Sequence, residues 1–307
     1  MANKKNDQND TPWKVMIENL IEDFLSFFFP KIFEKIDFSK GYRFLSKELF
    51  KITKDSEIGK RFADELLEVT YKDGSIKLIL IHIEIQSYEE KDFAQRMFTY
   101  NYKIRSKFNK DVLSMAVLTD ENDKFRSNVF EFESEDFLLK FKFPIIKILD
   151  YKDKIIALQE SSNPFAVVVL SQLKFFEAKN RPEGEKFNIK LNLIRNLYEK
   201  DFSKEKIIEL FCFIDWIIQL SKELEEKVQD IILEIEGVKK MPYVSTIEKR
   251  GIERGIEKGI ERGIERGIEK GKLKTAQNML KDGFTIEQIA KYTELSLKVL
   301  KKLLAEK

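Results

Sequence analysis

Three residues that could form a metal site stand on either side of one predicted turn. Asp64 lies before the dipeptide Asp73-Gly74, and Glu84 and Gln86 lie after it. Asp-Gly between two strand-like runs is a strong signal of a β-hairpin, which would bring the two carboxylates together. Like charges opposed across strands repel, so such a pair needs a compensating cation. Mg²⁺ is suited to it, because it takes oxygen ligands from one or two carboxylates together with substrate phosphate.

The register of the hairpin follows from its turn. Lys72 and Ser75 are expected to pair across a two-residue loop. Asp64 then lies opposite Ile83 and one residue from Glu84, and a one-residue bulge would set the two carboxylates directly opposite. The carboxylates are predicted to come close in either case.

Alternation along the second strand separates a polar face from an apolar one. The polar face carries His82, Glu84 and Gln86. The other face carries isoleucines that are expected to be buried, namely Ile79, Ile81, Ile83 and Ile85.

Three neighbouring residues leave alternatives. His82, the only histidine, is either a general base on the site face or a structural or exposed residue. Glu65 would be the ligand in place of Asp64 if the register slipped by one residue, and Glu68 could belong to the same face as Asp64.

A helix is expected over residues 91–108, after the hairpin. Its apolar seam consists of Phe93, Met97, Ile104 and Phe108. Beside that seam the helix carries a stripe formed by Arg96, Tyr100, Lys103 and Lys107. The stripe is either a nucleic-acid-binding surface or an ordinary solvated helix face.

Several of these elements occur together in a known family. Asp64-x-Leu66, the Asp73-Gly74 turn, IHIEIQ at 81–86 and RMFTYNYKI at 96–104 resemble the recombination-promoting nuclease and putative transposase group of the PD-(D/E)XK nucleases. The match runs from Lys47 to Asp120, about a quarter of the chain. It implies an α/β (α+β) fold with a PD-(D/E)XK restriction-endonuclease-like αβββαβ core, here with a helical C-terminal extension.

The resemblance also implies a site and a reaction. It implies phosphodiester hydrolysis in DNA, with Asp64, Glu84 and the backbone carbonyl of Ile85 as ligands of Mg²⁺, or of Mn²⁺ or Ca²⁺ in its place. Glu48 resembles an acidic residue that some nucleases of this type add to the metal site.

Gln86 stands where the family pattern usually has lysine. A lysine would both orient the attacking water and neutralise the charge of the transition state, whereas an amide can do only the first. Arg96 is the nearest candidate to supply the missing charge.

The chain divides into four predicted regions. These are a nuclease-like domain (1–150), a helical region that packs on the core or follows it (151–245), a Gly-Ile-Glu-Arg/Lys repeat (246–272) and a small three-helix unit resembling a helix-turn-helix (273–307). The expected helices cover 13–36 with a break at Pro30, 42–52, 91–108, 163–178, 187–198 and 204–235, and the expected strands cover 62–71, 76–86, 112–119 and 138–148.

The repeat places six glycines at a spacing of four, from Gly251 to Gly271. Each glycine costs a helix roughly 1 kcal/mol relative to alanine. The segment is therefore a flexible linker, a fraying helix or a helix that associates with itself. The last three predicted helices are 273–280, 285–292 and 296–304, with a capping box at Thr285 and Gln288, and they form a DNA-binding unit, a three-helix cap or a protein-binding module.

Composition narrows the setting of the protein. With 43% hydrophobic residues the chain can bury a large core, and its single cysteine, Cys212, excludes an internal disulfide. The polar beginning of the chain lacks a secretory signal, so a cytoplasmic protein without membrane contact is expected. Net charge is +2, with 15 Lys or Arg and 10 Asp or Glu in residues 241–307 against 40 and 43 in the rest.

These features together predict a metal-dependent DNA endonuclease that acts in recombination or transposition. Its expected partners are DNA and further copies of itself, joined through the repeat or the C-terminal helices. The alternative is a non-catalytic DNA-binding or assembly protein that keeps the nuclease fold.

Overall fold

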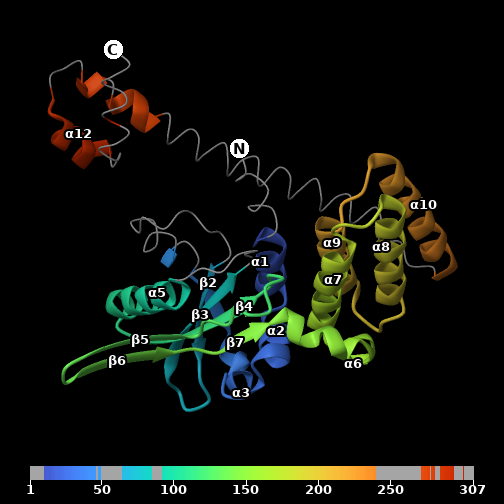
Figure 1. The fold of residues 1–307 in the computed structure, drawn as a ribbon, viewed down its shortest axis with the longest axis horizontal. Helices are drawn as coiled ribbons and strands as arrows, with labels where there is room; N and C mark the ends of the chain where they lie inside the picture. The colour runs from blue at the N-terminus through green and yellow to red at the C-terminus, as the bar shows by residue number, and fades with distance from the viewer. Residues whose placement is uncertain are drawn as a thin grey trace. The chain divides into compact units, whose positions relative to one another are not determined.

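A mixed five-stranded sheet forms the centre of the fold (Figure 1). Its strands are β1 (Tyr42–Phe44), β2 (Asp64–Thr70), β3 (Ile76–Glu84), β4 (Asp111–Leu118) and β7 (Ile145–Lys147), in the order β1-β2-β3-β4-β7. β1, β2 and β3 pair antiparallel, whereas β3, β4 and β7 pair parallel. The protein is thus a mixed α/β fold, as the sequence predicts.

This computed structural model describes residues 10–45, 48–49, 64–84, 92–239, 271–276, 278–280, 284–293 and 300. For Asp64 and residues 82–84 the description covers the backbone. The chain divides into two units, Met1–Val238 and Lys239–Lys307.

Helix α5 (Phe93–Phe108) covers one face of the sheet, which we call the α5 face. Leu66, Leu78 and Leu80 of the hairpin pack there with Tyr100 and Ile104 in one buried cluster. A second cluster joins the start of α5 to β4 through Phe93, Met97, Ala116 and Leu118. The Asn101 amide fixes the helix further by donating to the Val112 carbonyl (3.0 Å) and to Ser114 Oγ (2.9 Å).

The opposite face of the sheet, which we call the α1 face, lies against α1 (Asp10–Asn19). Ile79 and Ile81 point to this face and are fully buried, as predicted for the isoleucine side of β3. Lys14 of α1 forms an ion pair with Glu65 of β2, with Nζ 2.7 Å from Oε1. α2 (Ile21–Phe28) and α3 (Pro30–Phe33) follow, with the predicted break at Pro30 and a further break after Asn19.

Helices α6 to α9 belong to the same unit as the sheet. They are α6 (Ile155–Glu160), α7 (Pro164–Ala178), α8 (Glu183–Tyr198) and α9 (Lys204–Ile217), and α10 (Lys222–Lys239) continues them to the boundary of the unit. Trp13 of α1 joins the two parts, because its ring contacts Phe165 and Phe213 and its indole donates to Gln172 (3.1 Å). Figure 1 shows α7 and α9 beside α1.

Three predicted elements need correction. The helix expected over residues 42–52 begins as strand β1, which pairs with β2 through Tyr42↔Val69. The strand expected over residues 138–148 is split between β6 (Phe137–Lys142) and β7, because Pro144 lies between them and has no N–H for a ladder. The helix expected over residues 204–235 is divided into α9 and α10.

The strand β5 (Val129–Ser134) was not predicted. It pairs with β6 as a two-stranded arm that projects beside the sheet (Figure 1). Phe130 and Phe141 anchor the base of the arm on Phe98 of α5.

The second unit contains α12 (Ile286–Thr293). Its predicted capping box is confirmed, since Thr285 N donates to Gln288 Oε1 (3.0 Å) and Gln288 N donates to Thr285 Oγ1 (3.3 Å). Residues 271–276 are helical, and Ala276 packs with Ile289 and Leu300. The repeat up to residue 270 and most of the last predicted helix lie outside the described residues. Among the helices that the structure describes, none is long and apolar enough to cross a membrane.

Candidate functional site

The hairpin register differs by one residue from the prediction. Tyr71 N donates to the Ser75 carbonyl (2.8 Å), so the loop contains three residues rather than two. Gly74 takes the left-handed conformation that such a loop requires, with φ of 82°. As a result Asp64 lies opposite His82, and not opposite Ile83 as predicted.

This register places Asp64 and Glu84 on the same face of the sheet. Directly paired residues share a face, and so do residues two apart on one strand, so Asp64, His82 and Glu84 all belong to the α5 face. Asp64 and Glu84 are diagonal neighbours, a relation in which Cα atoms lie about 7–8 Å apart. The predicted two-residue loop would have put them on opposite faces.

Asp64 and Glu84 also lie at the edge of the sheet where a ligand would be expected to bind. β3, β4 and β7 run parallel, so their carboxyl ends form one edge, where Glu84 pairs with Leu118 and Leu118 pairs with Lys147. Asp64, which begins the antiparallel β2, lies at the same edge. Ligands of open α/β sheets bind outside the carboxyl ends of the strands.

The four residues of the stripe predicted on α5 differ in their exposure to solvent. Arg96 is only 2% exposed and Tyr100 only 4%, so both belong to the buried side of the helix, and the solvated-face interpretation is wrong for them. Arg96 lies over the Phe93 ring, with Cζ 5.5 Å from the ring centroid. Lys103 is half-buried and Lys107 is exposed, so these two alone could meet a ligand at the helix surface.

Two other acidic residues of β2 have structural partners. Glu65 lies on the α1 face, where it is fully buried and forms an ion pair with Lys14. Because Asp64 is on the α5 face, the sheet lies between the two residues. Glu68 lies on the α5 face but forms ion pairs with Arg43 (2.9 Å) and Lys110 at the other end of the strand. Lys110, as hydrogen-bond donor and charge, holds the pKa of Glu68 below its ordinary value.

The remaining predicted residues are placed only in part. Glu48 is half-buried beside Leu49, which packs with Leu66 on the α5 face. Ile85 and Gln86 lie outside the described residues.

A buried ion pair at the carboxyl edge was missed by the sequence analysis. Lys147, at the end of β7, lies 2.6 Å from Asp120, two residues past the end of β4, and both side chains are fully buried. The Asn122 backbone N–H also donates to the Asp120 carboxylate (2.8 Å). Burial lowers the pKa of the Lys147 ammonium, while Asp120 opposes that shift. A charged residue in the apolar run FPIIKIL was the available signal.

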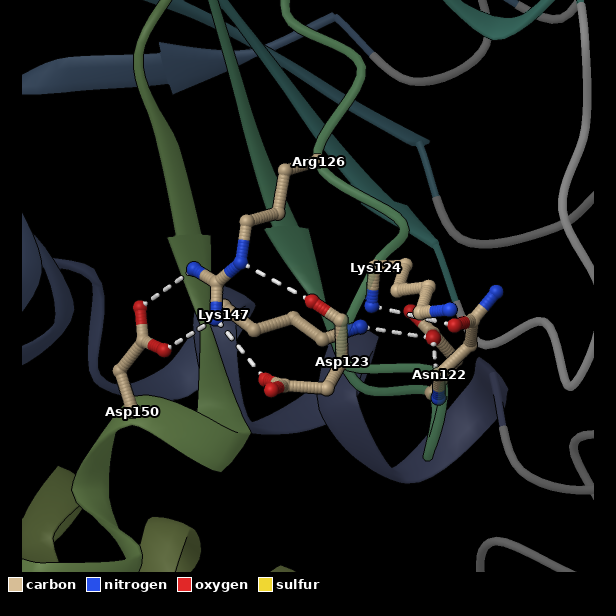
Figure 2. Close-up of polar contacts among 7 residues, drawn as sticks. Asn122, Asp123, Lys124, Arg126, Lys147 and Asp150 are labelled. Atoms are coloured by element: carbon tan, nitrogen blue, oxygen red, sulfur yellow. Dashed lines mark hydrogen bonds and ion pairs between the residues drawn. The ribbon is translucent and has the colours of Figure 1, made fainter.

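Arg126 connects the two chain segments that flank the ion pair of Lys147 and Asp120 (Figure 2). Arg126 donates to Asp150 (2.8 Å) and, from the other side, to Asp123 (3.1 Å). The hydrogen bond from Arg126 lowers the pKa of Asp150. The loop after β4 is therefore tied to the segment after β7.

The donor set at this edge suits a hard divalent ion. Asp64 and Glu84 offer carboxylate oxygens, which Mg²⁺ prefers, on one face and two strands. Within the side chains that the structure describes, which exclude those two, no three His, Cys, Asp or Glu residues are grouped as a metal site requires. Comparisons with family models, with curated proteins and with solved structures find no match.

Proposed function

We propose that the protein is a Mg²⁺-dependent DNA endonuclease of the PD-(D/E)XK type. The register of the hairpin carries the proposal, because it brings Asp64 and Glu84 to one face at the carboxyl edge. Two carboxylates in this relation, with the Ile85 carbonyl as a third oxygen ligand, would hold an ion that also binds a DNA phosphate.

The order of elements supports the same proposal. Glu48 and Leu49 are helical and precede the antiparallel hairpin of β2 and β3, and α5 and β4 follow, with β4 parallel to β3. A hairpin followed by a helix and a parallel strand agrees with the second part of the αβββαβ core that the sequence resembles. The resemblance extends the proposal to a role in recombination or transposition.

The residues have separate tasks in this proposal. Asp64 and Glu84 would hold the metal ion, which when bound would supply activation of a water and stabilisation of charge on the phosphate. Gln86 would orient the attacking water, and the resemblance adds Glu48 to the metal site. Lys103 and Lys107 of the predicted stripe on α5 would contact the DNA backbone.

Cleavage of supercoiled plasmid tests the proposal. The purified protein should nick or linearise the plasmid with Mg²⁺ and not with EDTA, and Asp64→Ala and Glu84→Ala should each lower the rate at least about 100-fold. Asp73→Ala is the matched control, because it removes a carboxylate from the turn at the other end of the same hairpin. Equal cutting by all three variants would refute the site. DNA binding without cutting by the wild type would favour the non-catalytic alternative.

A further inference from the structure

The arm formed by β5 and β6 projects beside the sheet with open strand edges (Figure 1). Within the part of the chain that the structure describes, each of the two strands pairs only with the other. The outer edge of a strand carries N–H and C=O groups that can pair with a further strand. The arm is therefore a place where a second chain could extend a sheet.

One face of the arm is apolar along its whole length. Directly paired residues share a face, and we call this one the aromatic face. It is formed by Phe130, Phe132, Phe137, Leu139 and Phe141. Phe98 of α5 covers the base of the aromatic face, whereas Phe132 and Phe137 near the tip are 52% and 56% exposed. An exposed apolar surface of this kind is typical of a contact with another protein surface.

The hydrogen bonds within the arm determine which residues of β6 can pair with a new strand. Phe143 N donates to the Asn128 carbonyl (3.1 Å), and hydrogen-bonded pairs alternate with the other pairs along an antiparallel ladder. The backbone groups of Leu138, Lys140 and Lys142 therefore point away from β5. A second copy of β6 that runs antiparallel must pair through these same residues, which puts the aromatic faces of both arms on one side of the combined sheet.

Two such registers overlap most of β6, and their charges distinguish them. In one register Lys140 lies opposite its own copy, and like charges repel. In the other, Leu139 lies opposite its own copy and Lys140 lies opposite Leu138 of the second copy. Lys142 then meets Asp136 of the second copy, and neither residue forms an ion pair with another of the described residues. The second register is therefore complementary in shape and in charge.

The edge of β5 does not allow a symmetric pairing of this kind. Glu131 and Glu133 are the residues of β5 that correspond to Lys140 and Leu138 across the arm. The registers that overlap most of β5 oppose Glu131 either to its own copy or to Glu133 of the second copy, so like charges meet in each of them. Charged side chains on an edge strand commonly prevent such pairing.

We propose that the protein forms a twofold dimer in which β6 pairs antiparallel with β6 of a second copy, with Leu139 at the twofold axis. The two arms then form one four-stranded sheet with a continuous aromatic face, in which Phe137 of each arm packs beside Phe141 of the other. The inference does not depend on the proposed function. It assigns self-association to the arm rather than to the repeat or the C-terminal helices.

A disulfide across the twofold axis tests the register directly in the full chain. Leu139→Cys is made together with Cys212→Ser, because Cys212 is the only cysteine of the chain. The two copies of residue 139 would form a pair without hydrogen bonds, with Cα atoms about 4.5 Å apart, which a disulfide can span. We expect mild oxidation to convert most of the chain into a covalent dimer. Phe132→Cys in the same background is the matched control, because Phe132 pairs with Leu139 within the arm but lies on the far strand, and it should not cross-link.

Proline substitutions on the two edges of the arm test which edge is used. Leu138 and Glu133 are directly paired, and their N–H groups point to opposite edges. Leu138→Pro removes a donor to Lys140 of the second copy, so we expect the dissociation constant of the dimer, measured by sedimentation velocity, to rise at least about tenfold. Glu133→Pro should leave it within about threefold of the wild-type value.

An exchange of charges tests the same register without a change in the backbone. Asp136→Lys would oppose two lysines at each end of the dimer, so the dissociation constant at low salt should rise at least about tenfold. Asp136→Lys combined with Lys142→Asp restores opposite charges, and the dissociation constant should return to within about threefold of the wild-type value.

The possible outcomes decide between this dimer and other assemblies. A wild type that remains monomeric up to about 100 µM, where a specific dimer should form, overturns the inference. A dimer that persists in Leu138→Pro and gives no disulfide through Leu139→Cys lies on another surface and also overturns it. Open-ended assemblies would mean that β5 of one copy pairs with β6 of the next, which contradicts the twofold register. If Leu138→Pro does not fold, the charge exchange decides, and failure of the double variant to restore the dimer overturns the inference.

Discussion

The ion pair between Lys14 and Glu65 allows stability and chemistry to be tested on neighbouring residues. Glu65 is fully buried, whereas Lys14 is 29% exposed. Lys14→Met would leave a carboxylate buried without this partner, which costs about 3–5 kcal/mol of unfolding free energy. Glu65→Gln would leave a lysine that can turn to solvent or toward Glu18, 3.9 Å away, so we expect a cost of about 1–2 kcal/mol. Lys14→Met with Glu65→Leu should recover most of the loss.

Thermal unfolding followed by circular dichroism gives the first measurement. For a unit of this size 1 kcal/mol shifts the melting temperature by roughly 2–4 °C, so Lys14→Met should lower it by roughly 6–20 °C. Plasmid cleavage gives the second. Glu65→Gln should keep its cleavage rate within about threefold, because Glu65 is on the α1 face and Asp64 on the α5 face. Glu65→Gln with an unchanged melting temperature and abolished cleavage would refute this register and make Glu65 the ligand.

Two further predictions concern the hairpin. Gly74→Ala should cost about 1–2 kcal/mol in urea unfolding, because φ is 82°, whereas Gly184→Ala in helix α8 should be neutral or slightly stabilising; equal effects would contradict the turn geometry. Glu68 has a folded-state pKa below that of the unfolded chain, so it contributes stability above the ordinary pKa of 4.5 that is lost as the pH falls through the lowered value. The melting temperature of Glu68→Gln should therefore fall less than that of the wild type between about pH 5 and pH 3. An equal fall in both proteins would contradict the lowered pKa of Glu68.

Local patterns were sufficient to predict most elements near the site. Alternation identified β2 and β3, and helical periodicity identified α5, because both patterns come from burial of one face. The register could not be predicted to one residue. Asp73-Gly74 is compatible with a two-residue and a three-residue loop, and the difference moves Asp64 from one face to the other.

Local sequence patterns could not predict how the edge strands pair or which charged residues are buried. β1 has only three residues, too few for a period, and β7 was predicted only as the end of one longer strand over 138–148. The pairing of β1 with β2 and of β7 with β4 is made across long sequence distances. Arg96 was expected on a basic stripe beside the apolar seam, because its spacing from Tyr100, Lys103 and Lys107 puts these residues on one side of a helix. Its burial depends on how α5 rotates on the sheet, which the sequence of the helix alone does not determine.

The observed register changes which residues can complete the site. With Asp64 and Glu84 on the α5 face, any group that acts on the same phosphate must approach from that face or along the carboxyl edge. A ligand at Glu65 would lie on the α1 face, on the other side of the sheet from Asp64 and Glu84. The ion pair of Lys147 and Asp120 is fully buried at the same edge, where Arg126 also ties the loop after β4 to the segment after β7 through Asp123 and Asp150.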